Sequence, residues 1–133
     1  MKEDIIVPKV EGIGIAIVKE LDEGEEVHNA YFINFNNFPV ENVLISSKGY
    51  GMKDDKQIKT STFRHYFKQV DAESFQLIEH ISEEVFGINN EFFVTYYIGK
   101  LIYDKKYVFL PGTISQENFI DIKLLNKQGV LIK

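Results

Sequence analysis

Residues 91–98 read Glu-Phe-Phe-Val-Thr-Tyr-Tyr-Ile and are followed directly by Gly99 and Lys100. Aromatic and β-branched side chains fit a pleated, half-buried surface, and a glycine after such a run marks a turn. Residues 91–98 therefore predict a β-strand, and similar short runs recur along the chain. The pattern indicates an all-β domain with an aromatic interior.

The other strand-like runs lie between clusters of turn-forming residues. Counting residues 91–98, we expect strands over residues 13–21, 26–35, 40–47, 57–69, 74–81, 91–98, 101–103, 107–110, 118–124 and 129–132. In the first run, isoleucines alternate with Gly, Ala and Val, which predicts large side chains inward and small ones outward. In the second, Val27, Tyr31, Ile33 and Phe35 share one face.

The segments between these runs predict turns and short irregular elements. Residues 48–56 predict a loop or a wide hairpin, and residues 104–106 predict a hairpin tip. Residues 63–67 fit a strand, with a short helix as the competing interpretation. Ser82 as an N-cap and Gly87 as a stop predict one helical turn between them.

Seven to nine short strands at this spacing are typical of a two-sheet antiparallel β-sandwich with immunoglobulin-like or Greek-key connections, and we predict that architecture here. An open β-barrel is the alternative. The chain has 133 residues, which fits one domain over residues 1–133. It contains no Cys and no Trp, so the likeness to antibody domains concerns the architecture only.

Composition excludes several classes of protein. The hydrophobic share of 44% is too high for a disordered chain, and charged residues interrupt every run long enough to span a membrane. The absence of Cys excludes a disulfide framework, a thiolate metal site and a Cys nucleophile. The first nine residues lack the apolar core of a secretion signal, so we expect a cytoplasmic protein.

The charge is distributed unevenly around a net value of −5. Residues 48–70 contain six basic and two acidic side chains, whereas the segments on both sides are acidic. This basic stretch supplies the candidate partner surface: Lys48, Tyr50, Lys53, Lys56, Lys59, Arg64 and His65. Such a surface suits phosphates or an acidic protein. The other interpretation is a solvated hairpin whose lysines protect a sheet edge, and it is favoured by Asp54 and Asp55 within the stretch.

The sequence contains no motif for catalysis, a metal or a cofactor, and we expect none of the three. Gly49 and Gly51 follow a strand but lack the spacing of a phosphate-binding loop. His65 and His80 fit neighbouring strands with Glu79 nearby, yet no close ligand spacing accompanies them.

The sequence contains the serine, histidine and aspartate residues from which a hydrolase triad could be assembled. Ser46, Ser47 or Ser61 would be the nucleophile, and His65 or His80 the base. The glycine-flanked nucleophile elbow that supports such an assignment is absent from the sequence.

Tyr96 and Tyr97 must point to opposite faces of one strand, because side chains alternate along it. One is therefore expected in the core and the other at least partly exposed. An exposed tyrosine beside Phe93 and Thr95 fits an anchor for a protein or sugar partner, and it also fits ordinary cross-strand packing.

Three segments carry a resemblance to a known group of proteins. They are Asn-Val-Leu-Ile-Ser-Ser-Lys-Gly-Tyr-Gly at residues 42–51, Lys-Thr-Ser-Thr-Phe-Arg-His at residues 59–65 and Tyr-Ile-Gly at residues 97–99. The chain resembles a family of short, uncharacterised bacterial all-β proteins. The resemblance implies an all-β fold and carries over no activity, cofactor or binding residue.

The leading functional hypothesis is a non-enzymatic β-sandwich that binds a protein partner or associates with itself. A nucleic-acid-associated module using residues 48–68 is the second hypothesis. The third is a small-molecule binder or enzyme with an unrecognised pocket, for which Ser61, Thr62, Arg64 and His65 form the nearest polar cluster.

Overall fold

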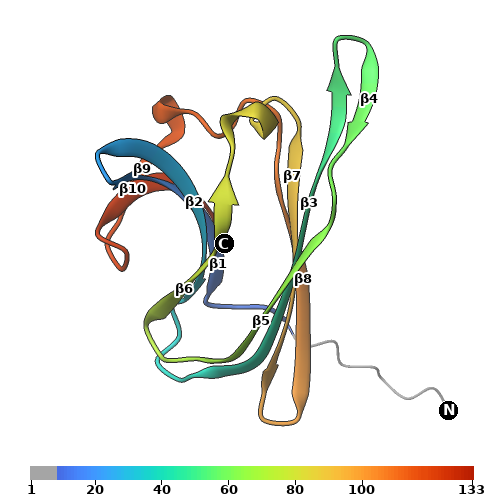
Figure 1. Cartoon of the computed structure of the whole chain (residues 1–133). Coiled ribbons are helices and arrows are strands. Elements are labelled where there is room, and N and C mark those ends of the chain that lie inside the picture. The colour runs from blue at the N-terminus through green and yellow to red at the C-terminus, as the bar shows by residue number, and fades with distance from the viewer. Residues whose placement is uncertain (1–8) are drawn as a thin grey trace, which may run out of the picture.

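Two antiparallel β-sheets stack face to face in the computed structural model, which describes residues 9–133 (Figure 1). Sheet A has the strand order β6-β2-β1-β10-β9, and sheet B has the order β4-β3-β7-β8, with β5 also paired to β3. The elements are β1 (Ile13–Asp22), β2 (Glu25–Asn34), β3 (Val40–Lys53), β4 (Lys56–Lys59), β5 (Phe63–Val70), β6 (Ser74–Ile81), η1 (Glu83–Val85), β7 (Asn89–Ile98), β8 (Leu101–Phe109), η2 (Gln116–Asn118), β9 (Ile120–Ile122) and β10 (Lys127–Ile132). The predicted all-β sandwich is confirmed, and across residues 9–133 the sheets do not close into a barrel. The immunoglobulin-like character of the connections stays a prediction.

The long strand β3 organises sheet B. One edge of β3 pairs with β7, and the other pairs first with β5 and then with β4. Of the two alternatives predicted for residues 48–56, the hairpin is confirmed and the loop is wrong, because β3 continues to Lys53, the chain reverses at Asp54 and Asp55, and β4 pairs back onto β3. Residues 63–67 lie within β5, so the competing helix is wrong. The pairing with β3 along its length favours the extended backbone.

The β7–β8 hairpin differs from the sequence prediction in where it turns. The chain reverses at Gly99 and Lys100, and residues 101–109 form one continuous strand. The expected tip at residues 104–106 is therefore wrong. Gly99 has a φ of 59°, which glycine adopts without steric cost, whereas Asp104 and Lys106 alternate outward along β8. Their charge reflects an exposed strand face and not a turn.

The C-terminal segment is also less extended than predicted. The strand expected over residues 118–124 is reduced to β9, because residues 116–118 form η2 and the chain turns after Ile122. The strand expected over 129–132 begins earlier, at Lys127 in β10. The one helical turn expected after Ser82 is present as η1, and the Ser82 hydroxyl accepts a hydrogen bond from the Glu84 amide.

The main core lies between the sheets and is rich in aromatic rings. Sheet A contributes alternate residues of β1 and β2, and sheet B contributes alternate residues of β3, β7 and β8. The largest buried side chains in this core are Phe32, Phe92, Tyr96, Tyr107 and Phe109. Phe92 and Phe109 pack edge to face, with ring centroids 5.9 Å apart. The predicted aromatic interior is confirmed.

A second, smaller core covers the outer face of sheet A. Ala16, Val18 and Ile33 are fully buried there under the segment that carries Ile122 and Leu125. The expectation that the small residues of β1 face outward is correct for their direction but wrong for their exposure. Burial on both faces explains why residues 13–18 lack polar side chains.

Asn34 links the two sheets at the end of the sandwich that holds the β5–β6 turn. The residue is fully buried, and its Nδ2 donates to the backbone oxygens of Phe38, Val70 and Asp71, at 2.8, 3.3 and 3.0 Å. Its Oδ1 accepts a hydrogen bond from the Asn36 amide at 3.0 Å. A strand of sheet A thereby holds the end of β5 in sheet B.

Two core tyrosines differ in whether the hydroxyl has a partner. The Tyr107 hydroxyl donates to the backbone oxygen of Ile13 at 3.4 Å. The Tyr96 hydroxyl is buried and has no hydrogen-bond partner within residues 9–133. The Tyr96 ring stacks on the Tyr103 ring, with ring centroids 5.1 Å apart. Burial raises the pKa of Tyr96 to about 12. Burial also raises the pKa of Tyr107, so both hydroxyls are neutral under ordinary conditions.

We expect Tyr96→Phe to raise the free energy of unfolding by about 1 kcal/mol, because it removes a buried polar atom without breaking a hydrogen bond. Tyr107→Phe should lower that free energy by about 0.5 kcal/mol, because it breaks one long hydrogen bond. Urea denaturation of both variants checks this. Equal destabilisation by the two substitutions would contradict the conclusion that only the Tyr107 hydroxyl has a hydrogen-bond partner.

His28 lies in β2 next to η1 and is 9% exposed. Burial lowers its pKa from the ordinary value. The carboxylates of Glu83 and Glu26 oppose this shift by raising the pKa. Lys19 and His80 add to the lowering. The neutral imidazole is therefore the form that the fold favours.

The lowered pKa of His28 predicts that the fold loses stability in mild acid. The contribution is fully present above the unfolded pKa of about 6.5 and is lost as the pH falls towards the lower folded value, because the unfolded chain binds the proton first. His28→Phe should therefore show a smaller fall in the free energy of unfolding between about pH 7.5 and pH 5.5. Urea titrations at both pH values measure it, and parallel profiles for the two proteins would refute the assignment.

Candidate functional site

The basic candidate residues divide over three places in the fold. Lys48 and Tyr50 lie on the outer face of sheet B, where both contact the carboxylate of Glu91. Lys48 Nζ is 3.6 Å from Glu91 Oε2, and the Tyr50 hydroxyl donates to Glu91 Oε1 at 3.1 Å. Lys106 Nζ lies 3.8 Å from the same carboxylate. The charge of Lys48 is therefore balanced within the protein.

Lys53, Lys56 and Lys59 belong to the β3–β4 hairpin, which projects beyond the sandwich (Figure 1). All three are exposed. Asp54 and Asp55 form the turn between the strands, with φ of 52° and 61°. Two carboxylates thus sit among the lysines at the tip. This arrangement supports the interpretation that these lysines protect an exposed strand edge.

Arg64 and His65 point to opposite faces of sheet B, because both lie in strand β5. Arg64 is exposed and pairs across the strands with Ser46 on the outer face. His65 turns towards sheet A, and its Nε2 lies 2.8 Å from Glu79 Oε1. The two residues therefore cannot contact the same partner, and the candidate partner surface does not form one surface.

The outer face of sheet B carries an exposed apolar surface, which we call the sheet B patch. Its members alternate outward along four neighbouring strands. They are Leu44, Tyr66, Phe93, Tyr97 and Ile102. The exposed fraction is 49% for Leu44, 55% for Tyr66, 39% for Phe93 and 50% for Ile102. Tyr97 is half-buried, whereas Tyr96 is buried in the core, as the sequence predicts for this pair. A hollow of about 190 Å³ lies within the patch beside Arg64.

A polar cluster joins the sheets on the side where β5 passes into β6. The Ser47 hydroxyl donates to Glu79 Oε1 at 2.5 Å, and His65 bonds to the same oxygen. Ser47 is buried, and about a fifth of the Glu79 side chain is exposed. Because Ser47 and His65 belong to sheet B and Glu79 to sheet A, the carboxylate bridges the two layers.

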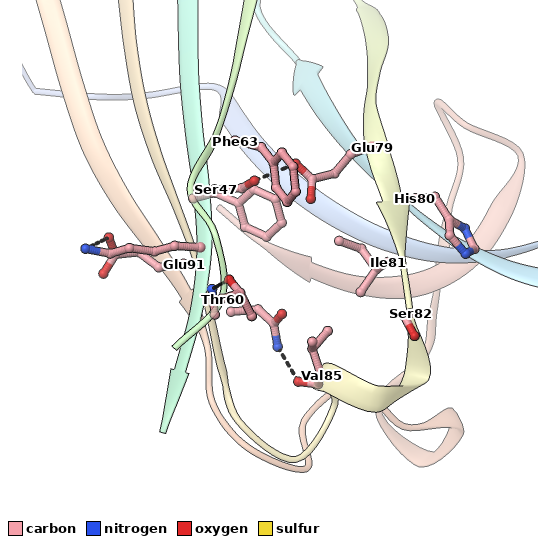
Figure 2. Close-up of a pocket in the computed structure, with 13 residues that line it drawn as sticks. Ser47, Thr60, Phe63, Glu79, His80, Ile81, Ser82, Val85 and Glu91 are labelled. Atoms are coloured by element: carbon pink, nitrogen blue, oxygen red, sulfur yellow. Dashed lines mark hydrogen bonds and ion pairs between the residues drawn. The ribbon is translucent and has the colours of Figure 1, made fainter. Parts of the chain in front are cut away.

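A cavity of about 180 Å³ opens beside this cluster, between the sheets and next to η1 (Figure 2). Its walls combine aromatic and aliphatic side chains with a few polar groups. The lining residues include Ser47, Thr60, Phe63, Glu79, Asn90 and Phe92. Figure 2 shows Glu79 pointing inward towards Ser47, whereas His80 points away on the other side of β6. The two neighbours in sequence thus face different environments.

The cluster does not form a hydrolase triad. Ser47 and His65 both bond to Glu79, and no serine hydroxyl among residues 9–133 donates to a histidine. The base would have to contact the nucleophile for proton transfer. Over the same residues, no three His, Asp or Glu side chains converge in a way that would hold a metal ion.

The sequence analysis missed the role of Glu79 and the extent of the sheet B patch. Glu79 does lie beside His65, but the expectation that His65 and His80 lie on neighbouring strands is wrong, because β5 belongs to sheet B and β6 to sheet A. The bridge from Glu79 to Ser47 needs the passage from one sheet to the other, which no local pattern encodes. The patch had a usable signal at two positions, because Leu44 and Phe93 each lie between buried residues. The missing information was which strands are neighbours.

Comparison with protein-family models, with curated proteins and with solved structures finds no match for the chain. In the part of the chain that the structure describes, no helix has the length and apolar character needed to cross a membrane.

We expect Glu79→Ala to lower the free energy of unfolding by about 1–3 kcal/mol, because it leaves the buried Ser47 hydroxyl without its acceptor. Glu84→Ala removes an exposed carboxylate of η1 and should change that free energy by no more than about 0.5 kcal/mol. Urea denaturation of both variants measures the difference. Equal stability of Glu79→Ala and the wild type would show that the bridge does not hold the sheets.

Proposed function

We propose that the protein is a non-enzymatic binding module that associates with a second copy of itself through the sheet B patch. The observation that carries this proposal is the exposure of Leu44, Tyr66, Phe93 and Ile102 on one sheet face. Contiguous apolar side chains on a protein surface, rimmed by charges, are characteristic of interaction sites. Aromatic residues at the centre suit such a site, because they bury much area at low entropic cost.

The order of side chains across the strands supports a second copy as the occupant. One outward row runs Arg64, Ser46, Phe93, Lys106, and the next runs Tyr66, Leu44, Thr95, Asp104. A two-fold axis across the strands, between these rows, places each row opposite the other row of the second copy. Lys106 then faces Asp104, and Arg64 faces the Tyr66 ring. Both contacts are favourable and occur twice.

The neighbouring rows extend the same complementarity. Glu41 and Lys48 lie on the outer side of β3, one on each side of the central rows. The same axis brings Glu41 of one copy towards Lys48 of the other. On β8 it brings Ile102 towards Val108, so apolar side chains also meet.

The size of the face indicates a reversible dimer. The face is four strands wide, at about 4.8 Å per strand, and its outward side chains extend about 20 Å along the strands. These dimensions give a flat area of roughly 400 Å². Stable complexes bury about 800 Å² on each partner, so this interface lies at the weak end of the range. We therefore expect association that depends on protein concentration.

A nucleic-acid surface in residues 48–68 has less support. Lys48 is paired with Glu91, the hairpin lysines surround Asp54 and Asp55, and His65 faces the interior. Arg64 is left apart from the hairpin lysines, on the rim of an apolar patch. A phosphate backbone needs several cations along one track.

Leu44→Glu should abolish the concentration-dependent dimer, because it buries a charge at the centre of the interface without a partner. The matched control is Leu77→Glu on the outer side of β6 in sheet A, where the leucine is similarly exposed, at 46% against 49%. Sedimentation velocity over a wide concentration range measures both. A wild type that stays monomeric throughout would refute self-association.

A charge exchange tests the orientation of the dimer. Asp104→Lys should weaken association by about tenfold, because lysines of the two copies then face each other twice. Adding Lys106→Asp should restore most of the affinity, while Lys48 remains next to Glu91 within each copy. Failure of the double variant to recover would refute the proposed axis, even if Leu44→Glu disrupts the dimer.

A further inference from the structure

We infer that the cavity between the sheets is a binding site for a small primary alkylammonium ion, with Glu79 as its counter-ion. This inference does not depend on dimer formation, because the cavity lies on the inner side of sheet B. It rests on the hydrogen-bonding capacity that the walls leave unused, on their charge and on the size of the cavity.

On the wall that Ser47, Thr60 and Asn90 form beside Glu79, the side-chain hydrogen-bond donors are already committed. The Ser47 hydroxyl donates to Glu79, and the Thr60 hydroxyl donates to the backbone oxygen of Ser61 at 2.9 Å. Asn90 Nδ2 donates to two backbone oxygens, at 2.8 and 3.2 Å. A ligand that needs donors, such as a carboxylate or a phosphate, would have to break these bonds.

The acceptors on the same wall keep free capacity. Both hydrogen bonds to the Glu79 carboxylate end on Oε1, from Ser47 and His65, and the second oxygen points towards the cavity (Figure 2). Asn90 is buried, and within residues 9–133 its Oδ1 accepts no hydrogen bond. A ligand with several N–H donors matches these acceptors.

The charge around the cavity also favours a cation. Lys48 lines the cavity, but its ammonium lies 3.6 Å from Glu91, which Figure 2 shows extending away from the cavity. Glu79 is therefore the carboxylate that faces the cavity. A largely buried carboxylate with a vacant lone pair loses part of its hydration, and an ammonium ion compensates this loss through a charge-assisted hydrogen bond.

The remaining walls limit the size of the ligand. Phe63 and Phe92 line the cavity together with Glu79, and Ile81 and Val85 complete the apolar part. A ring face attracts a cation as well as an alkyl chain. An apolar cavity of about 150 Å³ holds a benzene-sized molecule, so the observed 180 Å³ suits an ammonium with a short alkyl chain.

Three probes of equal chain length test the inference on the full chain: n-butylammonium chloride, 1-butanol and sodium butanoate. The measurement is the shift of backbone amide NMR signals at mildly alkaline pH, where histidine is neutral. We expect saturable shifts around Ser47 and Asn90 with butylammonium, about tenfold weaker binding of butanol and none of butanoate. Equal affinity for butanol and butylammonium, or shifts elsewhere in the protein, would overturn the assignment.

Variants separate the charge of Glu79 from its role in stability. Glu79→Gln keeps the shape and an amide oxygen and should weaken butylammonium binding by about tenfold or more. Glu84→Gln, the matched change at an exposed position of η1, should leave binding unchanged. Val85→Phe fills the cavity without touching the Glu79 bridge and should also abolish binding. Unchanged affinity in Val85→Phe would place the ammonium outside the cavity and overturn the inference, even if Glu79→Gln does not fold.

Discussion

Hydrogen bonds along the β5–β6 side hold the two sheets together, and the rest of the structure depends on them. Asn34 ties the end of β2 to the end of β5, and Glu79 of β6 binds Ser47 and His65 of sheet B. Apolar packing draws the sheets together but does not fix how they are aligned. A buried amide or carboxylate without its partners costs free energy, so these bonds select one alignment.

That alignment gives the same strands different roles on their two sides. Along β3, Val43 and Ile45 enter the core, Ser47 reaches the polar cluster, and Leu44 points outward to the sheet B patch. Along β7, Phe92 lines the cavity while Phe93 belongs to the patch. Two proposed binding surfaces therefore lie on opposite sides of one sheet, separated by a single layer of backbone. A change at one surface can be made without altering a side chain of the other.

Local patterns predicted the strands well where hydrophobic alternation was strong, as in residues 91–98. They failed where charge was taken as a turn signal. Asp104 and Lys106 alternate outward along an exposed strand, so they have the polarity of a turn without its geometry. Residues 48–53 include two glycines, yet they remain extended because β7 and β4 pair with them. In both segments, pairing with neighbouring strands kept the backbone extended although the local residues favoured a turn or loop.

The sequence by itself determined the fold class, the aromatic core and the alternation that turns Tyr96 inward and Tyr97 outward, because these follow from local periodicity. Only the tertiary structure decided which strands are neighbours. Strand order placed Leu44, Phe93 and Ile102 on one surface. The stacking of sheet A on sheet B placed Glu79 against Ser47 and His65. The physical reason is that pairing across strands depends on the packing of the whole core, which no short segment contains.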